Sequence, residues 1–392
     1  YIGIFIIMFS VISSGMVAVM TQNIGAGRPG VAYQARQLGL AFNAVLGVIM
    51  SLFLSLGAGT ILSGVGVADA LMQPAKTYLQ IVGGFCILNA LIPICSSYLR
   101  AFGFSKEPLY ASIIGNVINF CLNAFFLFVL HKGVAGVATA TVISRIINLV
   151  IVVLLGAVLV KAKQHPERES NRAVVGQIIR IGLPSACETA IYNVSMTLVI
   201  RFLNQMDAQG LNVTARSYTM QITNFSYCVG AALAQANAIM TGWHIGAKEY
   251  DACDRGTKKA AVIGVIVAVI LETVFTLCSG WIMQLFSKDP QMVSLVGKLL
   301  AIDIVLEIGR VTNLVYGQAL KTSGDAVFPV VMGACFMILC SVGGTYLFGI
   351  RLGLLAVGAY IGMTGDECVR AVGMYLRWKS GKWKEKGLVK SR

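Results

Sequence analysis

Residues 326–350, AVFPVVMGACFMILCSVGGTYLFGI, form an apolar stretch without a single charged side chain. A helix needs about 20 such residues to cross the roughly 30 Å hydrocarbon core of a bilayer, whereas a barrel strand runs for about 10 residues with polar alternation. Uncharged stretches of similar length occupy residues 77–99, 109–130 and 217–243. Because lipid offers no hydrogen bonds to the backbone, these stretches predict membrane-spanning helices.

The composition extends this interpretation to the whole chain. Of its 392 residues, 57% are hydrophobic and 12% are charged, and the mean hydropathy is +0.77. A soluble domain carries about 25% charged residues. We therefore predict an all-α integral membrane protein. Its eleven expected spans lie at residues 1–22, 37–64, 76–98, 108–130, 134–160, 178–203, 213–241, 259–286, 296–320, 326–349 and 352–376.

The distribution of positive charge indicates the orientation of these spans. A net charge of +14 could suggest nucleic-acid binding in a soluble protein. Here 21 of the 31 Lys and Arg residues fall on one side of the expected topology, and 7 fall on the other. By the positive-inside rule, the richer side, which carries the C-terminus, faces the cytoplasm. We expect a multi-pass protein of a bacterial cytoplasmic (inner) membrane, without a nucleic-acid partner.

Sequence signals for catalysis and metal binding are missing. The ten cysteines include no CxxC pair, and His131, His165 and His244 lie far apart. There is no P-loop, nucleophile motif or His-rich cluster, and no filter-like loop joins the spans. The sequence therefore predicts no enzyme, no metal site, no cofactor and no ion channel.

The chain repeats itself at a shift of 220–221 residues. Three motifs keep this register: MTQNIGAG against MTGWHIGA, LRAFG against LKTSG, and GVAG against GLLA. The second pair shares a proline nine residues after its leucine. The matched residues are 20–27 with 240–247, 99–103 with 320–324, and 133–136 with 353–356.

The repeat predicts the organisation of the chain. Copies with the same membrane orientation must each hold an even number of helices, and the second copy holds six. The first shows five, so we expect a parent of about 440 residues and twelve helices whose first helix precedes Tyr1. Two parallel repeats are a known design of secondary transporters. The predicted parts are an N-lobe 1–160, a linker 161–177, a C-lobe 178–378 and a basic cytoplasmic tail 379–392.

Four motifs together resemble the MATE (multidrug and toxic compound extrusion) family of the MOP flippase superfamily. Residues 22–27, QNIGAG, match the family's Gln-x-x-Gly-Ala-Gly. Residues 99–108 resemble the entry to its fifth helix, and 324–329 the entry to its eleventh. Residues 181–184, IGLP, followed by Glu188, resemble the start of its seventh helix. The resemblance covers nearly the whole chain.

This resemblance implies a secondary antiporter that works as a monomer. It would export small cationic or amphipathic organic compounds in exchange for H+ or Na+, by rocking of two lobes around a central cavity. A flippase for a lipid-linked saccharide, from the same superfamily, is the alternative. Arginines that line the cavity and face lipid phosphate would favour the flippase.

Glu188 is the first candidate for ion coupling. It lies about two turns into its predicted span, where an ionisable group is costly and calls for a function. The resemblance places it at an acidic position of the C-lobe cavity that takes part in cation or proton binding. A hydrogen-bonded structural glutamic acid is the alternative.

Asp303, Glu307 and Arg310 form a second candidate group for coupling. Their i, i+4 and i+7 spacing puts them on one helical face, and we expect Glu307 and Arg310 to form an ion pair. The resemblance implies a role for acids of this helix, although Arg310 departs from the family pattern. A structural clasp between helices is the alternative.

Asn116, Asn119 and Asn123 are candidates for the substrate cavity, and Tyr192 is assigned to it with them. Asn119 and Asn123 lie one turn apart on one face. The family often has an aspartate where Asn123 stands, and its main N-lobe acid lies on the first helix. Polar contacts that hold helices together explain the asparagines equally well.

Other charged positions receive no site role. Asp366, Glu367 and Arg370 lie within about one turn near the end of the last span, where local pairing and snorkelling explain them. Glu272 is isolated in the sequence and has no assigned role. Pro184 is expected at a helix start, where its missing N–H costs nothing.

Overall fold

The computed structural model is built of helices, and its described residues contain no strand. This confirms the all-α prediction. Three of the sequence predictions extend beyond the described residues. The positions concerned are Tyr1 in the first predicted span, 162–164 in the linker and 390–392 in the tail. The residues described are 2–65, 69–161, 165–207 and 210–389.

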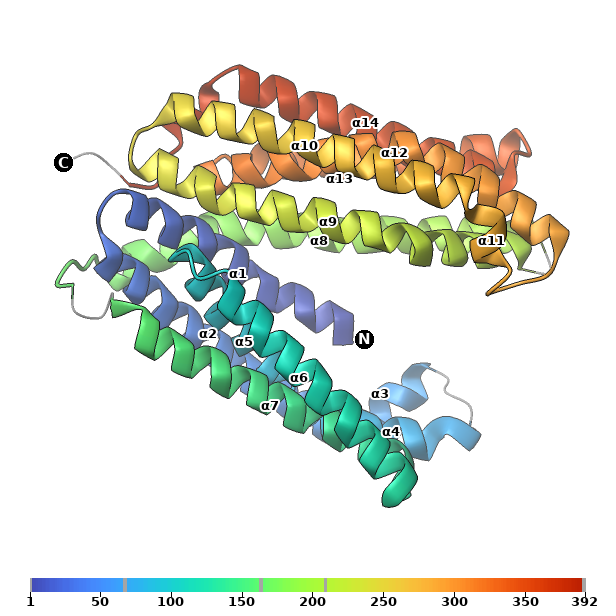
Figure 1. The fold of residues 1–392 in the computed structure, drawn as a ribbon, viewed down its shortest axis with the longest axis horizontal. Helices are drawn as coiled ribbons and strands as arrows, with labels where there is room; N and C mark the ends of the chain where they lie inside the picture. The colour runs from blue at the N-terminus through green and yellow to red at the C-terminus, as the bar shows by residue number, and fades with distance from the viewer. Residues whose placement is uncertain (1, 66–68, 162–164, 208–209, 390–392) are drawn as a thin grey trace. The chain divides into compact units, whose positions relative to one another are not determined.

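The chain forms two compact units, Tyr1–Leu183 and Pro184–Arg392 (Figure 1). Helix α8, Asn171–Met206, begins in the first unit and ends in the second. The other elements of the first unit are α1 (Ile2–Gly25), α2 (Pro29–Leu56), α3 (Ala58–Val65), α4 (Asp69–Gly84), α5 (Ile87–Ala101), α6 (Lys106–Ala124), η1 (Phe125–Val129) and α7 (Gly133–Leu159).

The second unit holds the longest helices. Helices α9 and α12 have 36 and 34 residues, well beyond the roughly 20 that cross a bilayer. Helix α12 contacts α9, α10 and α14, so it is the central element of this unit. The elements after α8 are α9 (Leu211–Gly246), α10 (Tyr250–Leu277), α11 (Ser279–Met283), α12 (Pro290–Ser323), α13 (Val327–Phe336), η3 (Met337–Val342), η4 (Thr345–Arg351), α14 (Leu355–Lys379) and η5 (Lys382–Glu385).

Each of the eleven predicted spans overlaps a helix or a run of consecutive helical segments, although α2 and α10 begin eight and nine residues before the predicted spans 37–64 and 259–286. By length and apolar content alone, five helical stretches of the described chain could cross a membrane, and a sixth if α4 and α5, bent by 41°, form one span. Long polar helices such as α8, α9, α12 and α14 are not among these. Pro184 lies inside α8 and not at a helix start, because this helix begins thirteen residues earlier, at Asn171.

The helix boundaries follow the internal sequence repeat. Helices α2 and α10 start at residues 29 and 250 and end at 56 and 277, a shift of 221 at both ends. Gly103 and Gly324, also 221 apart, both have a left-handed backbone, with φ of +89° and +98°. The third motif pair is displaced slightly, because α7 and α14 begin at Gly133 and Leu355, a shift of 222 and not 220.

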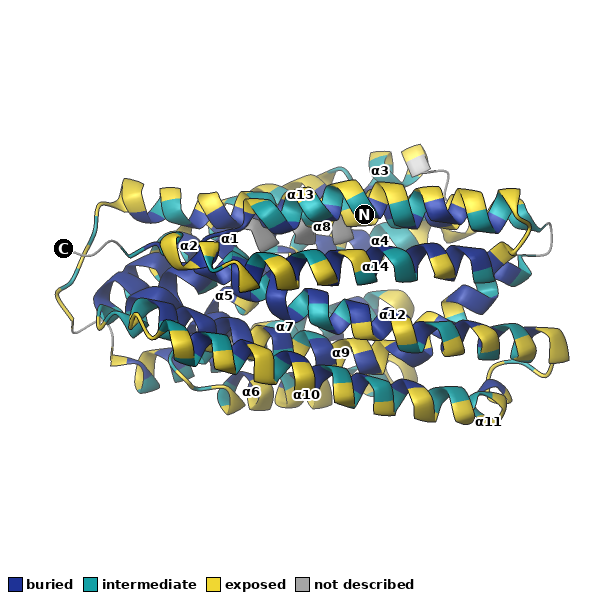
Figure 2. Cartoon of the chain, turned by 90° about the horizontal axis from the view of Figure 1, so that it is seen from above, coloured by how far each residue is buried: buried dark blue, intermediate teal, exposed yellow. Residues whose placement is uncertain are grey.

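Large apolar side chains cover the outside of the helices. Leu56 and Leu277 are more than 80% exposed, and Figure 2 shows exposed residues along α6 and α10. An apolar surface of this extent would be abnormal in water. In a bilayer this surface faces the hydrocarbon, and the charged side chains of the spans can be buried inside the protein beside its apolar clusters.

The C-terminal segment folds back onto the second unit. The Trp383 ring stacks on that of Trp378, with centroids 4.1 Å apart, and its Nε1 donates to the Trp378 carbonyl oxygen. Trp383 is buried among residues of α10, α12 and α14. A side chain at Gly324 would collide with the Lys386 carbonyl. The final turn therefore closes this end of the helix bundle.

Helices α12 and α14 make a close contact at Gly309. A Cβ atom there would lie 2.9 Å from the backbone of residues 367 and 368 on α14. Small residues permit such an approach between membrane helices. The contact brings the charged face of α12 against the polar face of α14.

Gly309→Ala should therefore destabilise the protein by about 1–3 kcal/mol, because the α14 backbone must move. Gly365→Ala is the matched control, since Gly365 lies on α14 with no atom near its Cβ position. It should be neutral or stabilising by up to about 1 kcal/mol, because alanine favours helix. Thermal unfolding of the purified full-length protein in detergent measures both changes. Equal melting temperatures would contradict the close contact.

Candidate functional site

Helix α12 supplies one half of a buried charged group. Asp303 is 2% exposed and Glu307 is fully buried. Arg310, one turn after Glu307, forms an ion pair with it, as predicted from the sequence. The pair lies between two apolar clusters of this unit, one containing Leu306 and the other Val311.

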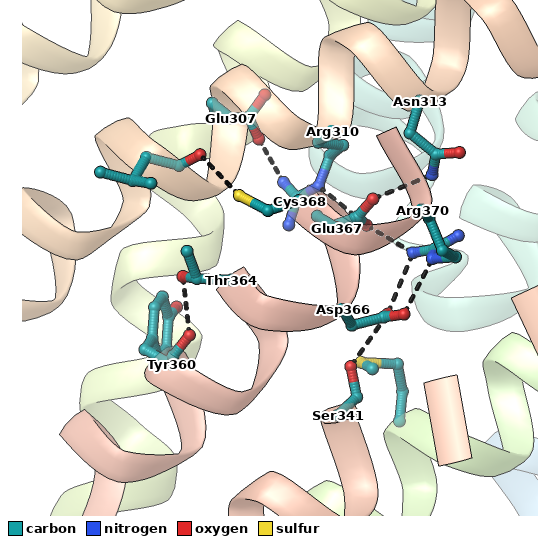
Figure 3. Close-up of polar contacts among 12 residues, drawn as sticks. Glu307, Arg310, Asn313, Ser341, Tyr360, Thr364, Asp366, Glu367, Cys368 and Arg370 are labelled. Atoms are coloured by element: carbon teal, nitrogen blue, oxygen red, sulfur yellow. Dashed lines mark hydrogen bonds and ion pairs between the residues drawn. The ribbon is translucent and has the colours of Figure 1, made fainter. Parts of the chain in front are cut away.

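Helix α14 supplies the other half (Figure 3). Arg370 binds both carboxylate oxygens of Asp366, at 2.9 and 3.0 Å. Its Nη2 also lies 2.9 Å from Glu367 Oε1. The same Glu367 oxygen is 3.7 Å from Arg310 Nε, so this carboxylate joins the two arginines across the helix contact.

Neutral side chains complete the hydrogen bonding of these acids. Asn313 Nδ2 donates to Glu367 Oε2 at 3.0 Å, and Ser341 Oγ donates to Asp366 Oδ2 at 3.0 Å. Both bonds are drawn in Figure 3. Glu367 and Asp366 therefore have fixed partners on more than one element, which orients them rigidly.

The structure corrects the interpretation of Asp366, Glu367 and Arg370. They do pair locally, but they do not snorkel, because the Arg370 side chain is only 4% exposed. Sequence spacing showed that they lie within about one turn. It could not show that this turn lies against the charged face of α12.

Glu272 on α10 is the residue that sequence reasoning missed most clearly. It is fully buried, and oxygen atoms of Glu272, Asp303 and Glu307 lie within 4.8 Å of one another. Within the described residues, both carboxylate oxygens of Glu272 lack a hydrogen-bond partner, as do Asp303 Oδ2 and Glu307 Oε2. We call these three residues the carboxylate triad. Oxygen ligands of this kind suit hard cations, and the same atoms can hold protons.

The carboxylate triad and the α12–α14 pairs form one continuous group with an excess of acid. It contains five carboxylates, adding Asp366 and Glu367 to the triad, and two arginines. If all were ionised, the described group would carry a formal charge of −3. An uncompensated charge is costly in a low-dielectric interior. Protons, a cation or a positive ligand must balance it.

Two adjacent cavities lie beside this group within the second unit. Cavity A, of about 220 Å³, is lined by polar groups including Arg216, Asp303 and Asp366, and by tyrosines and methionines. Cavity B, of about 250 Å³, includes Glu188 and Lys321. The residues that line both cavities are Tyr192, Tyr227, Arg310 and Glu367.

The structure separates the other predicted site residues. Glu188 does not join the carboxylate triad, because its Oε2 lies 2.5 Å from Lys321 Nζ. The sequence motif around Lys321 gave no sign of this pairing. The predicted asparagines lie on α6 of the first unit, where Asn123 donates to Asn119 at 3.1 Å and Asn116 is exposed.

Comparison with known proteins gives a consistent result. The family model described as MatE matches residues 2–125 and 184–347. Uncharacterized transporter YisQ of Bacillus subtilis (strain 168) is 32% identical over 394 residues, covering 99% of this chain and 86% of that protein. Probable multidrug resistance protein NorM of Thermotoga maritima is 22% identical, covering 96% and 82%.

The fold is also similar to solved structures. "Crystal structure of MATE in the bent conformation" matches with a TM-score of 0.88 at 18% identity, covering 97% of this chain and 86% of that chain. At this identity the likeness concerns the fold.

Replacing Arg310 tests the ion-pair group. Arg310→Met should destabilise the protein by about 3–5 kcal/mol, because it leaves buried carboxylates without their counter-charge. The double variant Glu307→Gln/Arg310→Met should recover part of this loss. Arg351→Met is the control, since Arg351 is exposed and contacts Tyr346. Melting temperatures of purified variants measure the effect, and equal values for both single variants would contradict the assignment.

Proposed function

The chain belongs to the MatE family of transporters, and from this premise we propose that it is a secondary antiporter. It exports small cationic or amphipathic organic compounds, and H+ or Na+ enters in exchange. Two lobes rock around a central cavity during the cycle. The homology to a probable multidrug resistance protein supports export of drug-like compounds.

The observation that carries this proposal is the acid excess of the buried group. An antiporter requires that ion and substrate exclude each other from the carrier. Five carboxylates facing two arginines can be neutralised by protons or a cation at one stage and by a positive substrate at another. Each neutralised state stabilises a different conformation of the carrier. This difference couples the entry of the ion to the export of the substrate.

We assign ion binding to the carboxylate triad. Its unpartnered oxygens converge within one small volume, and the Ser226 hydroxyl faces Glu272. Arg310 acts as a fixed positive charge that limits how many protons or cations the triad takes up. The triad supplies oxygen ligands for Na+ as readily as it supplies proton acceptors, so either ion fits the site.

Glu188 acts at cavity B, paired with Lys321. Because Lys321 already balances the charge of Glu188, this carboxylate attracts an ion less strongly than the triad does. A cationic substrate that displaces the Lys321 ammonium group would gain the carboxylate as a partner. Glu188 therefore contributes to coupling through competition between substrate and Lys321.

The lipid-linked saccharide flippase remains the second candidate. It would need cavity arginines free to face lipid phosphate. Arg310 and Arg370 are both engaged by carboxylates, which favours the exporter. Arg216 has no such partner among the described residues, and its contacts are considered below.

Glu272→Gln tests the assignment of the triad. The amide keeps the shape of the side chain but can neither release a proton nor attract a cation. Export by the full-length transporter in proteoliposomes should fall at least about tenfold and lose its dependence on the proton or sodium gradient. Glu385→Gln, an exposed change on η5, should leave both unchanged. Unaltered ion dependence in Glu272→Gln would remove the triad from the mechanism.

Glu188→Gln should have a different result. Substrate affinity should fall because the competing carboxylate is gone, while dependence on the ion gradient persists through the triad. Binding and flux are measured on the same reconstituted protein. If Glu188→Gln abolishes ion dependence and Glu272→Gln does not, the roles of the two acids are exchanged.

A further inference from the structure

Arg216 on α9 is a buried guanidinium without a counter-charge in the described structure. It is 6% exposed, and no described carboxylate lies within ion-pairing distance. Its Nε has no hydrogen-bond partner. Its Nη2 contacts only the sulfur of Met196, at 3.6 Å, and a thioether is a weak acceptor. Arg310 and Arg370, by contrast, are each held by carboxylates.

This isolation is physically unfavourable. An arginine in a membrane-spanning helix is costly even when it is paired, and a lone buried charge is costlier still. Arginine also keeps its proton, so it cannot escape the cost by becoming neutral. The cost is removed when an anion occupies the space in front of the guanidinium.

Cavity A provides that space. Its lining includes Arg216 together with Thr223 and Tyr227, which follow on the same face of α9. Residues 216 and 227 are eleven positions apart, which corresponds to about 16 Å along a helix. Tyr227 lies beside Arg310, whose guanidinium is 6.0 Å from its ring centroid. Arg216 thus stands at one end of cavity A and the acid-rich group at the other.

The walls between these ends are apolar and aromatic. Met196, Met220 and Met363 line cavity A together with Tyr192 and Tyr360. Methionines adapt to ligands of different shape, and tyrosine rings offer flat surfaces to aromatic or cationic groups. The cavity therefore combines one positive end, one negative end and an adaptable middle.

We propose that cavity A binds amphipathic zwitterions, with a carboxylate or phosphate group of the ligand on Arg216 and its cationic end toward Asp303 and Asp366. This inference rests on the proposed export function and narrows its substrate class. A guanidinium can bind either anion through two parallel hydrogen bonds. A purely cationic compound fills only the acid-rich end.

A matched pair of dyes tests this inference. A rhodamine with a free carboxyl group is a zwitterion, and its methyl ester is a cation of nearly the same shape. Binding of each dye to the purified full-length transporter is measured by fluorescence polarisation. The proteins compared are the parent, Arg216→Gln, Arg216→Lys and the exposed control Arg201→Gln.

Arg216→Gln should weaken binding of the acid dye by about 10- to 100-fold, because one charge-assisted contact is lost, and should leave the ester within about threefold. Arg216→Lys should restore much of the acid binding. In the absence of dye, Arg216→Gln should melt at the same temperature as the parent or higher, since it removes an unpaired buried charge. A structural arginine would instead lower the melting temperature and both affinities together.

Other outcomes overturn the inference in distinguishable ways. If the ester binds to the parent and Arg216→Gln affects both dyes equally, the anion contact is wrong and the export function stands. If neither dye binds to the parent, the zwitterion inference is overturned, and ion-driven export of other cationic compounds in proteoliposomes decides the proposed function separately. If a polyprenyl phosphate binds and neither dye does, the substrate is a lipid and the zwitterion proposal is overturned.

Discussion

A charge inside the hydrocarbon region must be neutralised within the protein, and the second unit is organised around this constraint. Acids on α10, α12 and α14 face inward, and arginines from α12 and α14 lie between them. The close contact at Gly309 makes this possible, because Glu367 can reach Arg310 only when the two backbones nearly touch. The large apolar side chains are left on the outside of the helices, where they face lipid.

The two sequence repeats differ in whether they bury charged side chains at matching positions. Shifted by 221 residues, Glu272, Glu307 and Arg310 correspond to Ser51, Cys86 and Asn89, which are uncharged. The helix also breaks in the first copy, between α4 and α5, where α12 runs without interruption. At that break the Ile87 amide donates to the Ser51 hydroxyl, in the position where the second copy has Glu272. One topology thus carries a broken neutral helix in one unit and a continuous charged helix in the other.

The sequence predicts the helices better than it predicts the site, for physical reasons. Apolar length indicates where a span lies but misses the polar helix ends, so α2 and α10 begin eight and nine residues before the predicted spans 37–64 and 259–286. The repeat motifs give the shift between corresponding helix ends to within one or two residues. Helical spacing also predicts the Glu307–Arg310 pair, because both residues lie on one turn of α12. The partners of Glu188 and Glu272 could not be predicted in this way. Lys321 and Asp303 meet these acids from other helices, and periodicity within a helix carries no information about its neighbours.

The stacked pair of Trp378 and Trp383 has a consequence for biosynthesis. Trp383 and the turn that covers Gly324 follow α10, α12 and α14 in the chain, so they leave the ribosome after these helices. The ends of α10, α12 and α14 therefore remain uncovered until residues 383–386 have been synthesised, even if the helices are already in the membrane. A nascent chain that stops before Trp383 would display Trp378 at the membrane surface, where chaperones and proteases that recognise exposed aromatic groups can act on it.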